Sequence, residues 1–136
     1  MAKLKRTTYD GLVSLLTDAR GQSATIGNNT TARLQQMGTG NPPVVTISLH
    51  GHDIVRLHHN DAASFNLAGW NTVTTRERIN QFLPDAWRVV TIGGDPYAVH
   101  REIDGTRDFK IPLAEYAGWY SVRDLNDRRR DAMTLN

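Results

Sequence analysis

The chain has 136 residues, 39% of them hydrophobic, which suits one domain with one core. It contains no cysteine, which excludes a disulfide framework and cysteine-based zinc sites. Its net charge of +2 excludes a polycation, and no apolar run approaches the roughly 18 residues of a membrane helix, so we expect a cytoplasmic protein with no membrane contact.

Arginine dominates the basic residues. Of the 16 basic residues, 13 are arginine and three are lysine. Arginine suits phosphate groups and base edges, although a GC-rich genome also favours arginine codons. The composition therefore permits contact with nucleic acid without requiring it.

The N-terminal third is expected to contain one helix and little sheet. After a flexible start at residues 1–8, apolar residues with helical spacing predict a helix over Tyr9–Arg20. Gly21–Asn29 is rich in turn formers and is interpreted as a linker. A weak strand is expected at Thr30–Gln36, before a proline-containing loop at Met37–Pro43.

The middle of the chain shows the clearest pattern. Apolar and polar residues alternate in Val44–Leu49, Ile54–His58 and Ala63–Leu67, with turn formers between these runs. This pattern predicts a three-stranded antiparallel meander. The residues expected on its buried face are Val45, Ile47, Val55, Leu57, Phe65 and Leu67.

A short helix is expected after the meander. Thr74 and Glu77 have the spacing of a capping box, and Pro84 would close the helix. Arg76 and Arg78 would then lie near its exposed first turn.

The remaining segments predict a second hairpin and a polar tail. Residues 87–92 and 97–103 form the hairpin, a turn follows at Asp104-Gly105, and residues 109–113 and 119–120 are further extended segments. Residues 1–122 are expected to form a single α+β domain: an antiparallel sheet of five to seven short strands, meander plus hairpin, with an N-terminal helix and one short mid-chain helix. The tail, 123–136, is expected to be frayed or one loose helix.

Four short motifs occur in order along the chain: GNNT (27–30), LHGHDIV (49–55), Gly69-Trp70-x-Thr72-x-Thr74-Thr75 and Arg78-Ile79-Asn80. These motifs resemble those of a group of small proteins encoded by tailed phages, best known from phages of actinobacteria. The resemblance covers roughly residues 27–120 and implies a phage source and a fold, because the group has no known function. The chain departs from the pattern at His52, where the group has threonine, and at Ala68, where it has the first of two glycines.

Four of the five histidines are clustered between residues 50 and 59. A metal site needs three or four converging ligands, and His50, His52, His58 and Asp61 are weak candidates. His58 and His59 point to opposite faces of a strand, and the spacing matches no zinc pattern. We therefore predict no bound metal and no cofactor.

The start of the short helix is the candidate anion or nucleic-acid site. Free backbone N–H groups, threonine hydroxyls and arginines can bind phosphate there, and an indole can stack on a base. The alternative is structural, with threonines as caps, arginines in solvent and the tryptophan in the core. The residues of this candidate site are Trp70, Thr72, Thr74, Thr75, Arg76 and Arg78.

The sequence favours binding over catalysis. It lacks the motifs of common enzymes, so no catalytic residue is predicted, although catalysis by residues distant in sequence stays open. The first hypothesis is a small phage accessory protein of the host cytoplasm that binds nucleic acid. The second is a binder or inhibitor of a host protein through an aromatic patch around Trp119 and Tyr120, and the third is a metal-dependent nuclease using the histidine cluster. Neither the partner nor the oligomeric state follows from the sequence.

Overall fold

The computed structural model describes residues 8–84, 86–102, 107–113 and 118–134. Within them the chain is α+β, with the expected N-terminal and mid-chain helices, and this class is confirmed. The helices are α1 (Tyr9–Thr17), α2 (Val73–Asn80) and α3 (Val122–Thr134), with short 3-10 helices η1 (Arg20–Gln22) and η2 (His59–Asp61).

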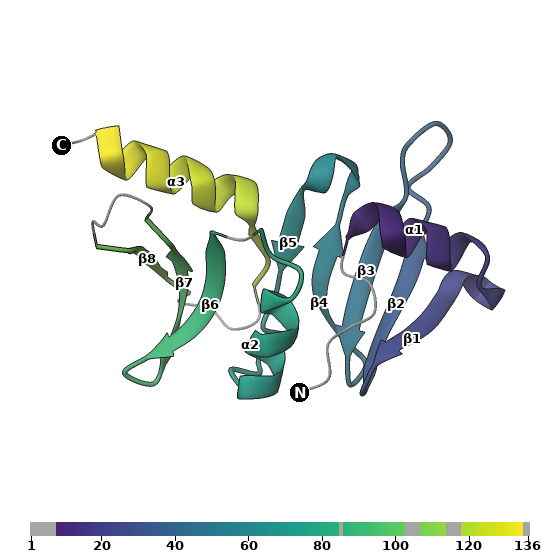
Figure 1. Cartoon of the computed structure of the whole chain (residues 1–136), viewed down its shortest axis with the longest axis horizontal. Helices are drawn as coiled ribbons and strands as arrows, with labels where there is room; N and C mark the ends of the chain where they lie inside the picture. The colour runs from purple at the N-terminus through teal and green to yellow at the C-terminus, as the bar shows by residue number, and fades with distance from the viewer. Residues whose placement is uncertain (1–7, 85, 103–106, 114–117, 135–136) are drawn as a thin grey trace.

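The strands are divided between two antiparallel sheets, where one sheet was expected (Figure 1). The first sheet has the order β1-β2-β3-β4-β5-β9, and its strands are β1 (Ser23–Gly27), β2 (Thr30–Gln35), β3 (Val44–Leu49), β4 (His52–Leu57), β5 (Ala63–Phe65) and β9 (Tyr120–Ser121). The second sheet has the order β6-β7-β8, with β6 (Trp87–Ile92), β7 (Asp95–His100) and β8 (Phe109–Pro112).

The predicted meander is confirmed. β3, β4 and β5 pair antiparallel in succession. Helix α1 lies across β1 to β3 in Figure 1 and buries Leu12 and Leu16. All six residues predicted for the inner face are buried: Val45, Ile47, Val55, Leu57, Phe65 and Leu67.

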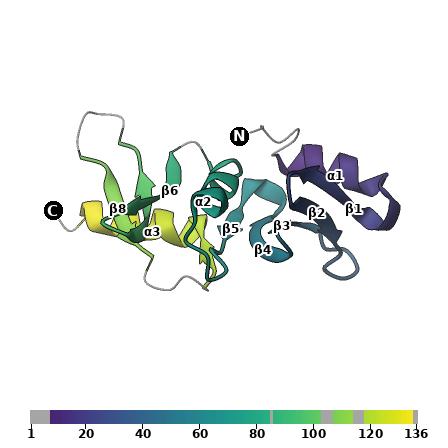
Figure 2. The ribbon, with the colours of Figure 1, turned by 90° about the horizontal axis from the view of Figure 1, so that it is seen from below.

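The break between the sheets has a specific cause at the end of α2. The Asn80 side chain donates from Nδ2 to Val89 O at 2.9 Å and accepts from Val89 N at 2.7 Å. It therefore occupies the edge of β6 where another strand would pair. Figures 1 and 2 show α2 between the two sheets.

Two predictions about the N-terminal third were wrong. The helix ends at Thr17 rather than Arg20, because Asp18 is its C-cap. The expected linker contains β1, which pairs with β2 and buries Ile26. Turn formers marked the segment as irregular, whereas pairing with a neighbouring strand made it a β-strand.

The C-terminal segment forms α3, so the structure shows the helical alternative. Val122 and Leu125 of this helix belong to the core. Trp87 donates from Nε1 to Asn126 Oδ1 at 2.7 Å, and Arg129 forms a two-point ion pair with Glu102 at 2.8 and 2.7 Å. These contacts hold α3 against the second sheet.

The expected turn at Asp104-Gly105 and residues 1–7 of the expected flexible start lie outside the described residues. In the part of the chain that is described, no helix is long and apolar enough to cross a membrane.

Candidate functional site

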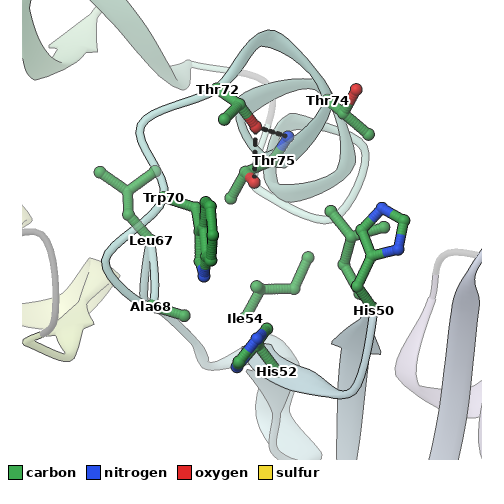
Figure 3. A pocket seen from close by; sticks show the side chains of 10 residues that line it. His50, His52, Ile54, Leu67, Ala68, Trp70, Thr72, Thr74 and Thr75 are labelled. Carbon is green, nitrogen blue, oxygen red and sulfur yellow. Dashed lines mark hydrogen bonds between the residues drawn. The ribbon is translucent and has the colours of Figure 1, made fainter.

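A pocket of about 360 Å³ opens between the β3–β4 turn and the first turn of α2 (Figure 3). Its volume is within the range of small-molecule sites. Ten residues line it: Leu49, His50, His52, Ile54, Leu67, Ala68, Trp70, Thr72, Thr74 and Thr75.

The first wall is the β3–β4 turn. His50 and Gly51 have φ values of +51° and +82°, and positive φ at both central residues defines the tight type I′ hairpin turn. The turn places His50 and His52 at the pocket. His50 N also donates to Asn29 O at 2.9 Å, so the GNNT and LHGHD segments lie together.

The second wall is a turn of the same kind before α2. Ala68 and Gly69 have φ values of +55° and +81°, and Trp70 N donates to Leu67 O at 2.8 Å. The turn directs Leu67 into the core and leaves the Trp70 side chain 55% exposed. The structural alternative, with Trp70 in the core, is therefore wrong.

The third wall is the N-terminus of α2. Thr72, with extended backbone, is the N-cap and accepts from Thr75 N at 3.2 Å. The Thr72 and Thr75 hydroxyls are 2.9 Å apart and share a hydrogen bond. The predicted cap at Thr74 was thus two residues late, since Thr74 already lies inside the helix.

The pocket has an apolar floor and an aromatic rim. Leu49, Ile54 and Leu67 are buried beneath it. The rings of His52 and Trp70 have centroids 6.1 Å apart and are tilted by 42°. Figure 3 shows Trp70, His52 and Thr75 around Ile54. This arrangement suits a flat ring that stacks on the indole and turns a polar edge to the hydroxyls.

Neither predicted arginine lines the pocket. Arg76 donates to Asn71 Oδ1 at 2.6 Å. Arg78 is only 2% exposed, and its Nε and Nη1 have no hydrogen-bond partner in the structure as described. The expected exposure of Arg78 was wrong because Thr75, Arg78 and Ile79 share the buried face of α2.

The predicted histidine cluster is divided. His50 and His52 line the pocket, whereas His58 lies beyond the far end of β4. Among the described side chains, no three His, Cys, Asp or Glu groups could hold a metal ion. The side chain of Asp61 is not described. The metal-dependent nuclease hypothesis therefore has no geometric support, and the absence of a metal stays a prediction.

The aromatic patch expected around Trp119 and Tyr120 is partly covered, since Trp119 is 36% exposed and Tyr120 is half-buried. Tyr120 stacks on Phe65, with ring centroids 5.6 Å apart. The Arg56 guanidinium lies 4.0 Å from the centre of the Trp119 ring. Trp70 is therefore more exposed than Trp119.

Sequence reasoning missed the pocket floor. It selected four lining residues at the helix start and two in the histidine cluster, but treated them as separate candidates. Apolar residues at strand ends carry no local signal that distinguishes a pocket floor from ordinary core. The missed lining residues are Leu49, Ile54, Leu67 and Ala68.

The fold and the pocket define a small α+β protein with an aromatic-rimmed pocket. The chain belongs to the Kyanoviridae Gp96 protein family, a phage family of unknown function whose model matches residues 16–110. All ten lining residues fall within the match. The match supports a phage origin but not the narrower resemblance to proteins of actinobacterial phages, nor its motifs. No curated protein and no solved structure matches the chain.

Proposed function

We propose that this phage protein is an accessory protein of the host cytoplasm that binds single-stranded nucleic acid and holds one unpaired base in the pocket. The observation that carries the proposal is the Trp70 indole, which is 55% exposed at the rim of an apolar pocket. Tryptophan is usually well buried in small domains, so an exposed indole needs a reason.

Stacking is the main source of affinity in this proposal. Base-on-aromatic stacking contributes about 1–3 kcal/mol per base and tolerates any base. The Thr72 and Thr75 hydroxyls share one hydrogen bond, and Thr72 also accepts from Thr75 N. The pair therefore keeps one O–H donor and one or two acceptor lone pairs, which suit the polar edge of more than one base. We therefore expect weak sequence preference.

The geometry favours single strands over duplexes. A base inside a duplex is stacked and paired, and extruding it costs a few kcal/mol. No lysine or arginine is among the ten lining residues, so the pocket itself does not bind phosphate through a fixed positive charge. Binding of a very short strand should therefore depend little on salt.

The test is a titration of labelled single- and double-stranded DNA and RNA. Trp70→Ala should weaken single-strand binding by about 5- to 150-fold, the equivalent of one lost stacking contact. Folding should be little affected, because the indole is exposed. Ile92→Ala, which removes an exposed apolar side chain on the second sheet, is the control. Absence of binding at roughly tens of micromolar protein, near the weak limit of non-specific binding, would end the proposal.

A second candidate function is binding to a host protein. It is favoured by the exposure of Val73, 60%, close to Trp70 at the start of α2. Together with the pocket floor, these side chains could accept an apolar anchor from a partner. Capture of a host protein that survives nuclease treatment and is lost in a Trp70→Ala, Val73→Ser variant would support this function over the first.

A further inference from the structure

A second groove, of about 820 Å³, lies between η2, β5 and the first turns of α3. It lies at the end of β4 opposite the pocket, as the positions of the β3–β4 turn and of the β4–β5 connection in Figure 1 show. His52 and His58 are six residues apart, which corresponds to about 20 Å along a strand. The groove is more open than the pocket and its lining is about equally polar and apolar, whereas the lining of the pocket is mainly apolar.

Arg123 supplies positive charge to this groove, beside the imidazoles of His58 and His59. All three side chains line it, and Arg123 is exposed with no ion pair among the described side chains. The pKa of His58 lies below its usual value, first through burial and then through the charges of Arg56 and His59. His58 is therefore less readily protonated than a free imidazole, and the groove relies on arginine for its positive charge.

The described carboxylate that lines the groove is already neutralised. Asp127 accepts from Arg130 at 2.7 Å, and the two side chains form an ion pair one helical turn apart. Among the described lining residues, the positive field in the groove therefore comes mainly from Arg123.

The uncharged side chains of the groove present donors. Asn126 uses Oδ1 to accept from the Trp87 indole N–H at 2.7 Å, which leaves its amide N–H groups to donate. Ser121 Oγ accepts from Asp124 N at 3.0 Å, which leaves its O–H to donate. Hydroxyl and amide donors next to arginine are the usual contacts to phosphate oxygens.

We propose that this groove holds the phosphodiester backbone of the same single strand whose base enters the pocket. The inference rests on the proposed function, and it assigns to the groove the phosphate contacts that the pocket cannot make. A span of about 20 Å corresponds to roughly six stacked nucleotides at 3.4 Å each. This span is within the usual site size of single-strand binding folds, about 4–16 nucleotides.

The experiment compares a short and a long strand over a range of salt. A strand of about three nucleotides reaches only the pocket, whereas one of about twelve reaches both sites. For the long strand, Arg123→Gln should reduce the slope of log Kd against log salt by about 0.7–1, the value of one lost phosphate contact. Binding of the short strand should be unchanged. Arg88→Gln, which removes an exposed arginine from the second sheet, is the matched control.

The outcomes separate the two proposals. If the long strand binds and Trp70→Ala weakens it, but Arg123→Gln gives the same salt slope as Arg88→Gln, the groove inference is overturned and the pocket proposal stands. If neither strand binds, the proposed function fails and the groove inference fails with it.

Discussion

Ala68 has the most costly backbone conformation in the pocket wall. Its φ of +55° lies in the left-handed region, which disfavours a residue with a Cβ by about 1–2 kcal/mol. The Ala68 side chain lines the pocket and is half-buried. The turn that places Trp70 at the pocket therefore costs folding free energy, and glycine at this position would remove most of this strain.

Ala68→Gly should raise the free energy of unfolding by about 0.5–1 kcal/mol, because relief of strain exceeds the entropy that glycine adds to the unfolded chain. Urea unfolding measures the difference. Ala62→Gly is the matched control: Ala62 has an ordinary extended backbone, with φ −70° and ψ 137°, so the same exchange should destabilise the protein. Equal losses in the two variants would contradict the assignment of strain to Ala68.

At the scale of elements, one polar cluster joins three neighbouring strands of the first sheet. Arg33 on β2 donates to both oxygens of Asp53 on β4, at 2.9 and 2.8 Å. Ser48 on β3 donates to Asp53 Oδ1 at 2.7 Å. The hydrogen bonds from Arg33, followed by that from Ser48 and the nearby positive charges, lower the pKa of Asp53 from 3.8 to about 2, against the opposing effect of burial. The ionised Asp53 carboxylate therefore links β2, β3 and β4 beside the pocket.

This cluster predicts a defined acid sensitivity. Because the pKa of Asp53 is lower in the folded state, its contribution is complete above about pH 4 and is lost as the pH falls through about 2. The difference in unfolding free energy between the parent protein and Asp53→Asn should therefore shrink over this interval. Arg33→Gln should reduce the same pH dependence, whereas Arg20→Gln, an exposed arginine outside the cluster, should not. A difference that stays constant from about pH 5 to pH 2 would contradict the role of the pair.

At the scale of the whole molecule, the two sheets share one core. The cluster of buried residues runs from Leu12 and Leu16 of α1 through the first sheet to Val89 and Ile111 of the second. Helix α3 adds Leu125 to this core. The ion pair between Arg129 and Glu102 and the hydrogen bond between Trp87 and Asn126 then join α3 to the second sheet.

We expect the chain to unfold in a single transition. Circular dichroism measures the loss of helix, and fluorescence measures the exposure of tryptophan. The two unfolding curves should coincide because the core is continuous. Arg129→Gln should lower the unfolding midpoints of both signals equally, although it alters only α3. Arg128→Gln, on the exposed side of the same helix, is the control and should leave both midpoints unchanged. Separate transitions for the two signals would show instead that the second sheet and α3 unfold as an independent unit.

The sequence alone determined the elements whose signals are local. Alternation of apolar residues predicted β3, β4 and β5 and their inner face, and helical spacing predicted α1. The tertiary structure decided what depends on distant partners. β1 became a strand by pairing with β2. Arg78 was buried because it lies on the inner face of α2. The Asn80 side chain took the hydrogen bonds that another strand would make with the edge of β6. The pocket needs the turn at His50, the turn at Ala68 and the cap at Thr72 to meet, and these segments are brought together only by the pairing of β3, β4 and β5. Local preferences act over a few residues, whereas a binding site depends on which surfaces the folded core brings together.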